Sequence, residues 1–224
     1  FNNMERLKDY ITTLHKSTKR KYLERMNDDK VSCMLEAKKY EVNYWDGDRR
    51  YGYGGYKYIP GRWSNLAEQI ITDYNLKDNS RILDAGCGKG FLLLEIKKQL
   101  PSIDIVGIDI SNHALKEAPE IFKNNFFIHN LKDTLPFKDN EFDLVISINA
   151  LHNLQIPDLK TAITEIERVG KNKYISVESY RSEKEQFNLQ CWALTCESFF
   201  NKDSWIWLFE HFGYKGDYEF IYFE

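Results

Sequence analysis

A strand, a glycine-rich turn and a helix follow one another without interruption within residues 81–96. Residues 81–83 read as the end of a buried strand, and Asp84 stands at its tip. Glycines at positions 86, 88 and 90 form a turn before the apolar stretch 91–96 begins a helix. Glycine has no Cβ and readily adopts positive φ, so this backbone can approach a ligand closely. Because the helix presents unpaired N–H groups behind the turn, the stretch predicts a nucleotide-type pocket.

Short apolar strands alternate with helices from residue 81 onward, which predicts an α/β fold with a doubly wound, mostly parallel sheet. The expected strands are 81–84, 103–109, 126–129, 142–148, 173–177 and 218–222, and the expected helices are 90–100, 111–122, 157–170 and 203–213. Residues 180–200 are expected to hold a helix and then a short strand. In such sheets ligands bind outside the carboxyl ends of the strands. The strand ends near residues 84, 109, 130 and 149 should therefore converge.

Residues 1–62 are expected to form an N-terminal helical cap and aromatic lid over a single globular domain, residues 63–224. Apolar spacing predicts helices at 5–27, 32–42 and 63–74. Residues 46–61 are rich in glycine and tyrosine and are expected to form an ordered loop. Such a segment can cover a ligand or pack as an aromatic cap on the sheet edge, and the sequence leaves both interpretations open.

The residue pattern of the glycine turn distinguishes between classes of nucleotide ligand. Dinucleotide-binding turns read GxGxxG, and phosphate-binding loops end in GK followed by Ser or Thr. Here the turn reads GCGKG, and Gly90 follows Lys89. The carboxylate of Asp84 would also repel a pyrophosphate, whereas it suits a cationic ligand. S-adenosylmethionine is such a ligand, because it carries a sulfonium and an ammonium and no phosphate.

Further segments follow the turn in a consistent order: LDAGCGKG at 83–90, VGIDIS at 106–111, LPFKDNEFDLVIS at 135–147 and INALHNL at 148–154. On these motifs the chain resembles the class I S-adenosylmethionine-dependent methyltransferases across residues 62–177. The resemblance implies a Rossmann-like methyltransferase fold, S-adenosylmethionine as cofactor and S-adenosylhomocysteine as product.

The resemblance also implies which residues hold the cofactor. Asp84 would lie near its ammonium, and Asp109 would accept the ribose hydroxyls, as the acid of dinucleotide folds does. The other expected contacts are the backbone of Gly86, Cys87 and Gly88 beneath the methionyl chain, Ile110 at the adenine face, Asn130 and Leu131 at the adenine edge, the backbone of Asn149 at the methionyl group, and Tyr58 and Arg62 at the carboxylate. The family often has an acidic residue where this chain has Asn130, so Asp133 or a plain loop role for Asn130 stays open.

Two groups that follow the fourth and fifth strands are candidates for catalysis. His152, which titrates near neutrality, is the expected general base, with Glu178 as the second catalytic candidate. The alternatives are a packing role for His152 and a salt bridge between Glu178 and Arg181. The acceptor is expected to contact Tyr180, Arg181, Asn188 and Trp192, in a part of the chain where polar and aromatic residues alternate. An aromatic cap on the sheet edge is the alternative for that segment too.

Composition argues against several kinds of partner. Lys and Arg number 31 against 34 Asp and Glu, a net charge of −3, so no basic excess indicates nucleic-acid binding. The absence of a long apolar run and of a recognisable leader predicts a cytoplasmic protein that does not enter a membrane. The four cysteines form no pattern typical of a metal site, so no metal is expected. The sequence leaves open whether the chain forms a homodimer.

Together these features predict methyl transfer from S-adenosylmethionine to an oxygen or nitrogen atom of a small polar metabolite. In its general features, though in no specific motif, the chain is similar to methyltransferases of bacterial surface-glycan and related small-molecule biosynthesis. A non-catalytic S-adenosylmethionine-binding subunit and a nicotinamide dinucleotide oxidoreductase are the alternatives. The oxidoreductase would have to bind a pyrophosphate at the glycine turn.

Overall fold

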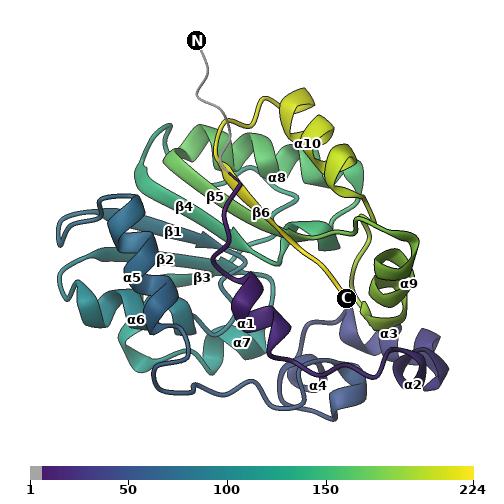
Figure 1. The fold of residues 1–224 in the computed structure, drawn as a ribbon. Helices are drawn as coiled ribbons and strands as arrows, with labels where there is room; N and C mark the ends of the chain where they lie inside the picture. Colours follow the sequence, from purple (N-terminus) through teal and green to yellow (C-terminus); the bar gives the residue numbers. More distant parts are fainter. Residues whose placement is uncertain (1–6) are drawn as a thin grey trace.

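The computed structural model describes residues 7–224, and at its centre lies a six-stranded sheet (Figure 1). The strand order is β3-β2-β1-β4-β5-β6, and every neighbouring pair is parallel. The strands are β1 (Arg81–Ala85), β2 (Asp104–Asp109), β3 (Phe126–Ile128), β4 (Phe142–Ile148), β5 (Gly170–Glu178) and β6 (Asp217–Ile221). The direction of winding reverses between β1 and β4. This confirms the doubly wound α/β fold and places the ligand-binding edge at the carboxyl ends of these two strands.

Helices cover both faces of the sheet because the strands carry apolar side chains on both faces. Along β1, Ile82 and Leu83 are fully buried in two different core clusters, since successive side chains of a strand point to opposite sides. One face packs against α5 (Ser64–Asp73) and α6 (Phe91–Gln99), and the other packs against α8 (Ile156–Val169) and α10 (Lys202–His211). The remaining helices are α1 (Thr12–Lys16), α2 (Tyr22–Asn27), α3 (Lys30–Ala37), α4 (Val42–Trp45), α7 (Asn112–Lys116) and α9 (Glu183–Trp192), with 3-10 turns η1 (Arg49–Tyr51), η2 (Glu120–Phe122) and η3 (Leu151–Asn153).

The two helices predicted near the N-terminus are each divided in the structure. The helix predicted at 5–27 is α1 and α2, and its first two residues lie outside the described part of the chain. The chain turns between them, where the Arg20 guanidinium donates to the carbonyls of His15 and Thr18 at 3.2 and 3.1 Å. The helix predicted at 32–42 is α3 and α4, and it is interrupted at Tyr40, whose φ of 54° is left-handed.

Two further predictions were also wrong: the extent of the helix at 111–122, and a short strand at the end of residues 180–200. The helix predicted at 111–122 ends at Lys116, because Pro119 has an extended ψ of 139° and interrupts the helix before η2. Within the described chain no strand forms between residues 193 and 200. The N–H groups of Glu197 and Ser198 instead donate to the carbonyl of His152 at 3.0 and 2.9 Å.

The segment before α1 lies along the outer edge of β6. Leu7 forms a parallel bridge to Tyr218, and the N–H of Lys8 donates to the carbonyl of Tyr218 at 2.9 Å. The buried carboxylate of Glu219 accepts the N–H groups of residues 10–12 at 2.8–3.1 Å. Glu219 therefore caps the start of α1 from the last strand of the sheet.

Residues 12–62 then cross the carboxyl ends of the strands, and we refer to them as the lid. Within the lid α2 packs against α9, and α3 packs against η1. Figure 1 shows α2, α3 and α4 gathered with α9 at one end of the molecule. Among residues 7–224, no helix combines the length and the apolar character required to cross a bilayer.

Candidate active site

A cavity of about 450 Å³ lies at the carboxyl ends of β1, β4 and β5, beneath the lid. Asp84 and the glycine turn line it from β1, Asn149 from the end of β4, and Glu178 from the end of β5. Its aromatic lining consists of Tyr44, Trp45, Tyr53, Tyr56, Trp63, Phe91, Trp192 and Phe223. A cavity of this volume, largely roofed by aromatic rings and with several ionisable groups, suits a small polar ligand.

The glycine turn is held by backbone hydrogen bonds and by Asp109. The N–H groups of Gly86 and Cys87 donate to the carbonyl of Ile108 at 2.8 and 3.0 Å. The two carboxylate oxygens of Asp109 accept the N–H groups of Gly88 and Ser111, both at 2.8 Å. Burial nevertheless raises the pKa of Asp109 above its usual range. The second strand therefore fixes the turn beside the first, in the conformation a ligand would meet.

Asp84 is the least satisfied polar group of the cavity. Its side chain is only 5% exposed, and its Oδ1 atom has no hydrogen-bond partner within residues 7–224. Burial, with a smaller contribution from the neighbouring Asp109 carboxylate, raises the pKa of Asp84 to about 8. A buried carboxyl without a partner costs free energy unless a cationic ligand supplies one. This geometry is the one expected for a residue that binds an ammonium group.

Trp45 lies directly over the second glycine of the turn. A Cβ placed on Gly88 would come within 2.7 Å of the Trp45 ring, so only glycine fits beneath the indole. The indole Nε1 donates to the Ser111 hydroxyl at 2.9 Å and to the carbonyl of Tyr40 at 3.0 Å. Trp45 thus spans the space from Gly88 to Ser111, next to Asp109. Beyond the indole, Ile110, Asn130 and Leu131 are not part of the cavity lining.

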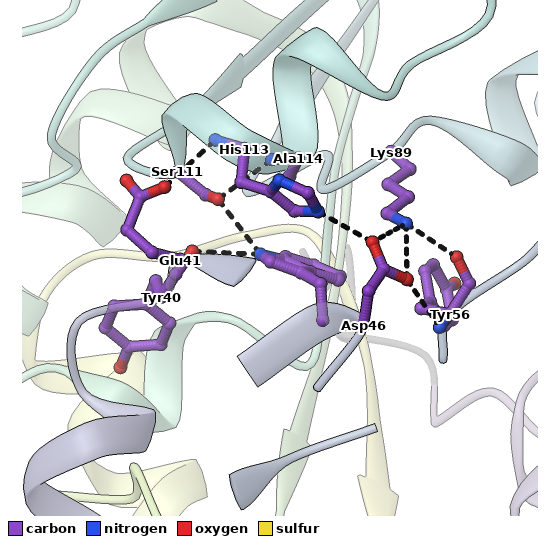
Figure 2. A network of polar contacts seen from close by, with 9 residues as sticks. Tyr40, Glu41, Asp46, Tyr56, Lys89, Ser111, His113 and Ala114 are labelled. Atoms are coloured by element: carbon purple, nitrogen blue, oxygen red, sulfur yellow. Dashed lines mark hydrogen bonds and ion pairs between the residues drawn. The ribbon is translucent and has the colours of Figure 1, made fainter. Parts of the chain in front are cut away.

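A polar network joins the lid to the elements below it (Figure 2). The carboxylate of Asp46 accepts two bonds from Nζ of Lys89, at 2.8 and 2.6 Å, and lies 2.6 Å from Nε2 of His113. Lys89 also donates to the carbonyl of Tyr56 at 2.9 Å. Although burial by itself raises the pKa of Asp46, the hydrogen bonds from His113 and Lys89 outweigh it and hold this pKa below its usual range. Lys89 of the turn therefore binds the lid, not a phosphate.

His152 and Glu178 contact each other at the acceptor side of the cavity. Nδ1 of His152 accepts the backbone N–H of Glu178 at 3.2 Å, which assigns the ring proton of the neutral imidazole to Nε2. Nε2 lies 3.4 Å from Oε2 of the Glu178 carboxylate. Burial lowers the pKa of His152, and the charge of Glu178 offsets part of this effect. His152 is therefore neutral near pH 7, and its Nε2 lies near a carboxylate that lines the cavity.

Nine of the 17 predicted site residues line the cavity and eight do not. Four of the eight, Asp109, Ile110, Asn130 and Leu131, lie outside its lining near the ends of β2 and β3. Arg62 and Trp192 line it with Asp84, Asn149 and the His152–Glu178 pair. The other four bind elsewhere: the Tyr58 hydroxyl contacts Glu95 and Lys98 on α6, Arg181 pairs with Glu185 and Glu224, the amide of Asn188 donates to the carbonyl of Phe223, and Tyr180 packs on the core.

Sequence analysis missed two sets of residues around the cavity. The first set holds the lid and consists of Trp45, Asp46, Lys89 and His113. The second set lines the cavity and consists of Arg20, Arg25 and Arg49. The abundance of aromatic residues in the lid was a usable signal for the first set. Nothing in the sequence pairs Asp46 with Lys89, 43 positions later, or brings together arginines from three separate places in the lid.

Comparison with known proteins agrees with this geometry. Residues 76–218 match a family described as a methyltransferase domain. The chain is 26% identical over 132 residues to the Bacillus subtilis (strain 168) protein YrhH, whose name assigns it to the methyltransferases, with 56% of this chain and 72% of that protein covered. It is 32% identical over 108 residues to demethylmenaquinone methyltransferase of Staphylococcus aureus (strain JH9), with 46% of this chain and 44% of that enzyme covered. The chain thus matches less than half the length of the staphylococcal enzyme.

A solved structure shares the fold. The cyclase SpnF superimposes with a TM-score of 0.54 at 20% sequence identity, with 83% of this chain and 68% of that chain covered. At that identity the likeness shows the fold alone. The family match spans most of the sheet, the acid-tipped strand and the glycine turn. The chain therefore belongs to the class I S-adenosylmethionine-dependent methyltransferases.

Proposed function

We propose that the protein transfers the methyl group of S-adenosylmethionine to an oxygen or nitrogen atom of a small polar molecule held in the cavity. The observation that carries this proposal is Asp84. Its buried carboxyl has an oxygen without a partner in the described residues, it stands beside the glycine turn, and it lines the cavity beneath the lid. A cationic ligand stabilises such a carboxylate, whereas a phosphate would destabilise it further.

The residues around the turn fit this cofactor. Asp84 would bind its ammonium, and Arg62, which also lines the cavity, would bind its carboxylate in the paired geometry that guanidinium groups favour. Asp109 keeps lone pairs for the ribose hydroxyls beside the two N–H groups that it already accepts. Ile110, Asn130 and Leu131 would contact the adenine once the Trp45 indole leaves the space between Gly88 and Ser111. When bound, the cofactor supplies an electrophilic methyl group.

Glu178 is the group that we propose as general base. Its carboxylate lines the cavity, while both ring nitrogens of His152 are directed at Glu178. A carboxylate within hydrogen-bond reach can accept the proton of an acceptor hydroxyl or ammonium. Nε2 of His152, 3.4 Å away, would orient that carboxylate when it donates to it, so His152 is a positioning residue in this proposal. The lid excludes water and holds the acceptor in line, which accounts for much of the rate gain available to such a transfer.

The acceptor itself stays a prediction at the level of chemical class. The name of the staphylococcal relative gives demethylmenaquinone as the acceptor of that enzyme. That relative covers only 46% of this chain, so its acceptor is not carried over. The charged lining of the cavity supports a small polar acceptor better than an apolar one. A place in bacterial surface-glycan biosynthesis, suggested by resemblance of style, stays a prediction as well.

Thermal-shift measurements with S-adenosylhomocysteine and NAD test the cofactor assignment directly. We expect S-adenosylhomocysteine to raise the melting temperature and NAD to leave it unchanged, because bound ligand stabilises only the folded state that binds it. Stabilisation by NAD alone would overturn the proposal. A screen of small metabolites with methyl-labelled S-adenosylmethionine then tests transfer. Label should reach an oxygen or nitrogen of a product with the wild-type protein and be strongly reduced with Glu178→Gln.

A further inference from the structure

Three arginine side chains of the lid surround the indole of Trp192 at the wall of the cavity. Arg20 precedes α2, Arg25 lies within α2, and Arg49 lies in η1. Their guanidinium carbons lie 5.4, 4.4 and 5.1 Å from the centre of the Trp192 ring. All three, with Trp192, line the cavity that holds Glu178. We call Arg20, Arg25 and Arg49 the arginine cluster.

In the part of the chain that the structure describes, the arginine cluster has no acidic partner. Within residues 7–224, no carboxylate oxygen lies within 4.0 Å of these three guanidinium groups, whereas the neighbouring Arg50 pairs with Asp28 at 2.8 Å. Arg25 uses Nε and Nη1 to donate to the carbonyls of Trp192 and Arg49, both at 2.9 Å. The buried Nε of Arg20 has no hydrogen-bond partner in the described chain. Donors of the cluster are therefore left for a ligand.

The like charges of the cluster oppose one another. Burial, followed by the charge of Arg49, lowers the pKa of Arg25 to about 10. Burial also lowers the pKa of Arg20 and of Arg49. Aromatic faces attract cations but do not neutralise them. Because buried or half-buried charges without a counter-ion are costly, a cluster of this kind gains stability when an anion binds.

The cofactor does not supply that anion. Five cationic side chains line the cavity, namely Arg20, Arg25, Arg49, Lys57 and Arg62, against the two carboxyl groups of Asp84 and Glu178. S-adenosylmethionine carries a sulfonium, an ammonium and one carboxylate, so its own net charge is positive, and a single arginine suffices for its carboxylate. The excess of cations arises in a chain whose net charge is −3. It indicates that a second, negatively charged molecule enters the cavity.

We propose that the methyl acceptor carries an oxyanion, a phosphate or a carboxylate, that binds the arginine cluster beside Trp192. This inference rests on the proposed function, since it names the class of acceptor for the same cavity. Guanidinium groups bind both oxyanions in bidentate geometry. The cluster holds the charged end of the acceptor, and Glu178 receives the proton of the hydroxyl or amine at its other end. Neutral analogues of the acceptor bind more weakly because they leave the cluster unpaired.

Isothermal titration with simple anions tests the inference without knowledge of the acceptor. Inorganic phosphate, pyrophosphate and succinate are titrated into protein saturated with S-adenosylhomocysteine. We expect binding of at least one of them, and roughly tenfold weaker binding in Arg25→Gln and in Arg49→Gln, because each substitution removes charge-assisted hydrogen bonds. The matched control is Arg50→Gln, which should bind within about twofold of wild type because Arg50 pairs with Asp28 outside the cavity. Preference for phosphate over succinate, or the reverse, identifies which oxyanion the acceptor carries.

Three results would overturn the inference: none of the anions binds, binding is equal in the cluster variants and wild type, or the anion competes with S-adenosylhomocysteine. Competition would assign the cluster to the cofactor carboxylate instead. Arg25 also donates to two backbone carbonyls, so Arg25→Lys and Arg20→Gln accompany it in case Arg25→Gln does not fold. The affinity of every variant for S-adenosylhomocysteine is measured separately. Failure of that binding in wild type contradicts the proposed function, whereas loss of anion binding alone contradicts only this inference.

Discussion

Nζ of Lys89 lies 2.8 and 2.6 Å from the two carboxylate oxygens of Asp46, so the glycine turn and the lid are joined by an ion pair (Figure 2). The Lys89 side chain is 4% exposed and that of Asp46 is 25% exposed. The pair also holds the neighbouring Trp45 indole over Gly88. The ion pair therefore attaches the lid to the glycine turn, above the position proposed for the cofactor.

Asp46→Asn should loosen the lid. It removes the charge partner of a buried lysine, and we expect the free energy of unfolding to fall by about 1–3 kcal/mol. Amide hydrogen exchange across residues 46–61 should become faster, and S-adenosylhomocysteine should dissociate roughly tenfold faster. Stopped-flow tryptophan fluorescence measures that rate, and because the chain has five tryptophans, Trp45→Phe identifies the part of the signal that comes from the Trp45 indole.

Asp48→Asn is the matched control for the lid, two residues further along the same loop. Asp48 only accepts the N–H of Arg50 at 2.9 Å, and asparagine can accept the same bond. The rates of amide hydrogen exchange and of S-adenosylhomocysteine dissociation should therefore match wild type within about twofold, because asparagine preserves the capping hydrogen bond. Equal exchange rates in Asp46→Asn and Asp48→Asn would show that the Asp46–Lys89 pair does not hold the lid.

Asp84→Asn should weaken the cofactor while it stabilises the unliganded fold. The substitution removes a charge-assisted hydrogen bond to the ammonium, and we expect the affinity for S-adenosylhomocysteine to fall about 10- to 100-fold. It also removes a buried carboxyl that has no partner for Oδ1, so the melting temperature without ligand should rise. Calorimetric titration and thermal unfolding of the same preparations measure both effects. A variant that loses stability and keeps its affinity would assign Asp84 a purely structural role.

The pH dependence follows from the raised pKa of Asp84. The folded protein holds this proton up to about pH 8, whereas an unburied aspartate releases it near 3.8. Folded Asp84 therefore binds more protons between these values, and its contribution to stability falls as the pH rises through this window. Cofactor binding requires the ionised carboxylate, so the affinity for S-adenosylhomocysteine should rise from about pH 6 to about pH 8 with release of a proton. In Asp84→Asn the rise in affinity should be absent and the stability slope should lose the contribution of Asp84, and calorimetry in buffers of different ionisation enthalpy tests this.

Glu178→Gln should affect the chemical step without affecting the cofactor. Loss of a general base lowers kcat by about 10²–10⁴-fold, while the affinity for S-adenosylhomocysteine stays within about twofold. A loss of kcat under tenfold at saturating acceptor would remove Glu178 from the role of base.

His152→Asn tests the positioning role separately. We expect a loss in kcat of about tenfold, smaller than for Glu178→Gln, because the carboxylate remains but is no longer oriented by Nε2. Burial lowers the pKa of His152, so the ratio of wild-type to variant kcat should be constant from about pH 7 to about pH 8. A ratio that changes around pH 6.5, the ordinary value for histidine, would assign the titration to His152 itself.

The convergence of Asp84 and Asp109 at one edge of the sheet was predictable from sequence because both residues belong to regular elements. Asp84 and Asp109 end adjacent parallel strands, and the register that pairs Asp84 with Gly107 brings the two carboxylates to one edge. Strand length and apolar pattern fix that arrangement before any tertiary detail is known. The positions of the six strands were predicted to within a few residues for the same reason.

The acceptor side could not be predicted in the same way. The arginine cluster comes from a turn, a short helix and η1, none of which has a strong periodic signal. The helix predicted at 5–27 had suitable apolar spacing, but the Glu219 carboxylate fixes where α1 begins, and a local turn held by Arg20 divides α1 from α2. Arg181 and Asn188 were predicted to bind the acceptor because the sequence shows the type of a side chain but not the direction in which it points. In the structure they bind Glu185 and the carbonyl of Phe223.

The bond from the N–H of Ile11 to the Glu219 carboxylate joins positions 208 residues apart, and it sets an order of events during folding. The N–H groups at the start of the lid find the Glu219 carboxylate only after β6 has joined the sheet, so the lid is fixed in place after the sheet is complete. Contacts of such long sequence separation form late because a large loop has to close first. A nascent chain therefore exposes its tyrosines, tryptophans and guanidinium groups to water until synthesis reaches β6, and only then does an enclosed reaction chamber exist.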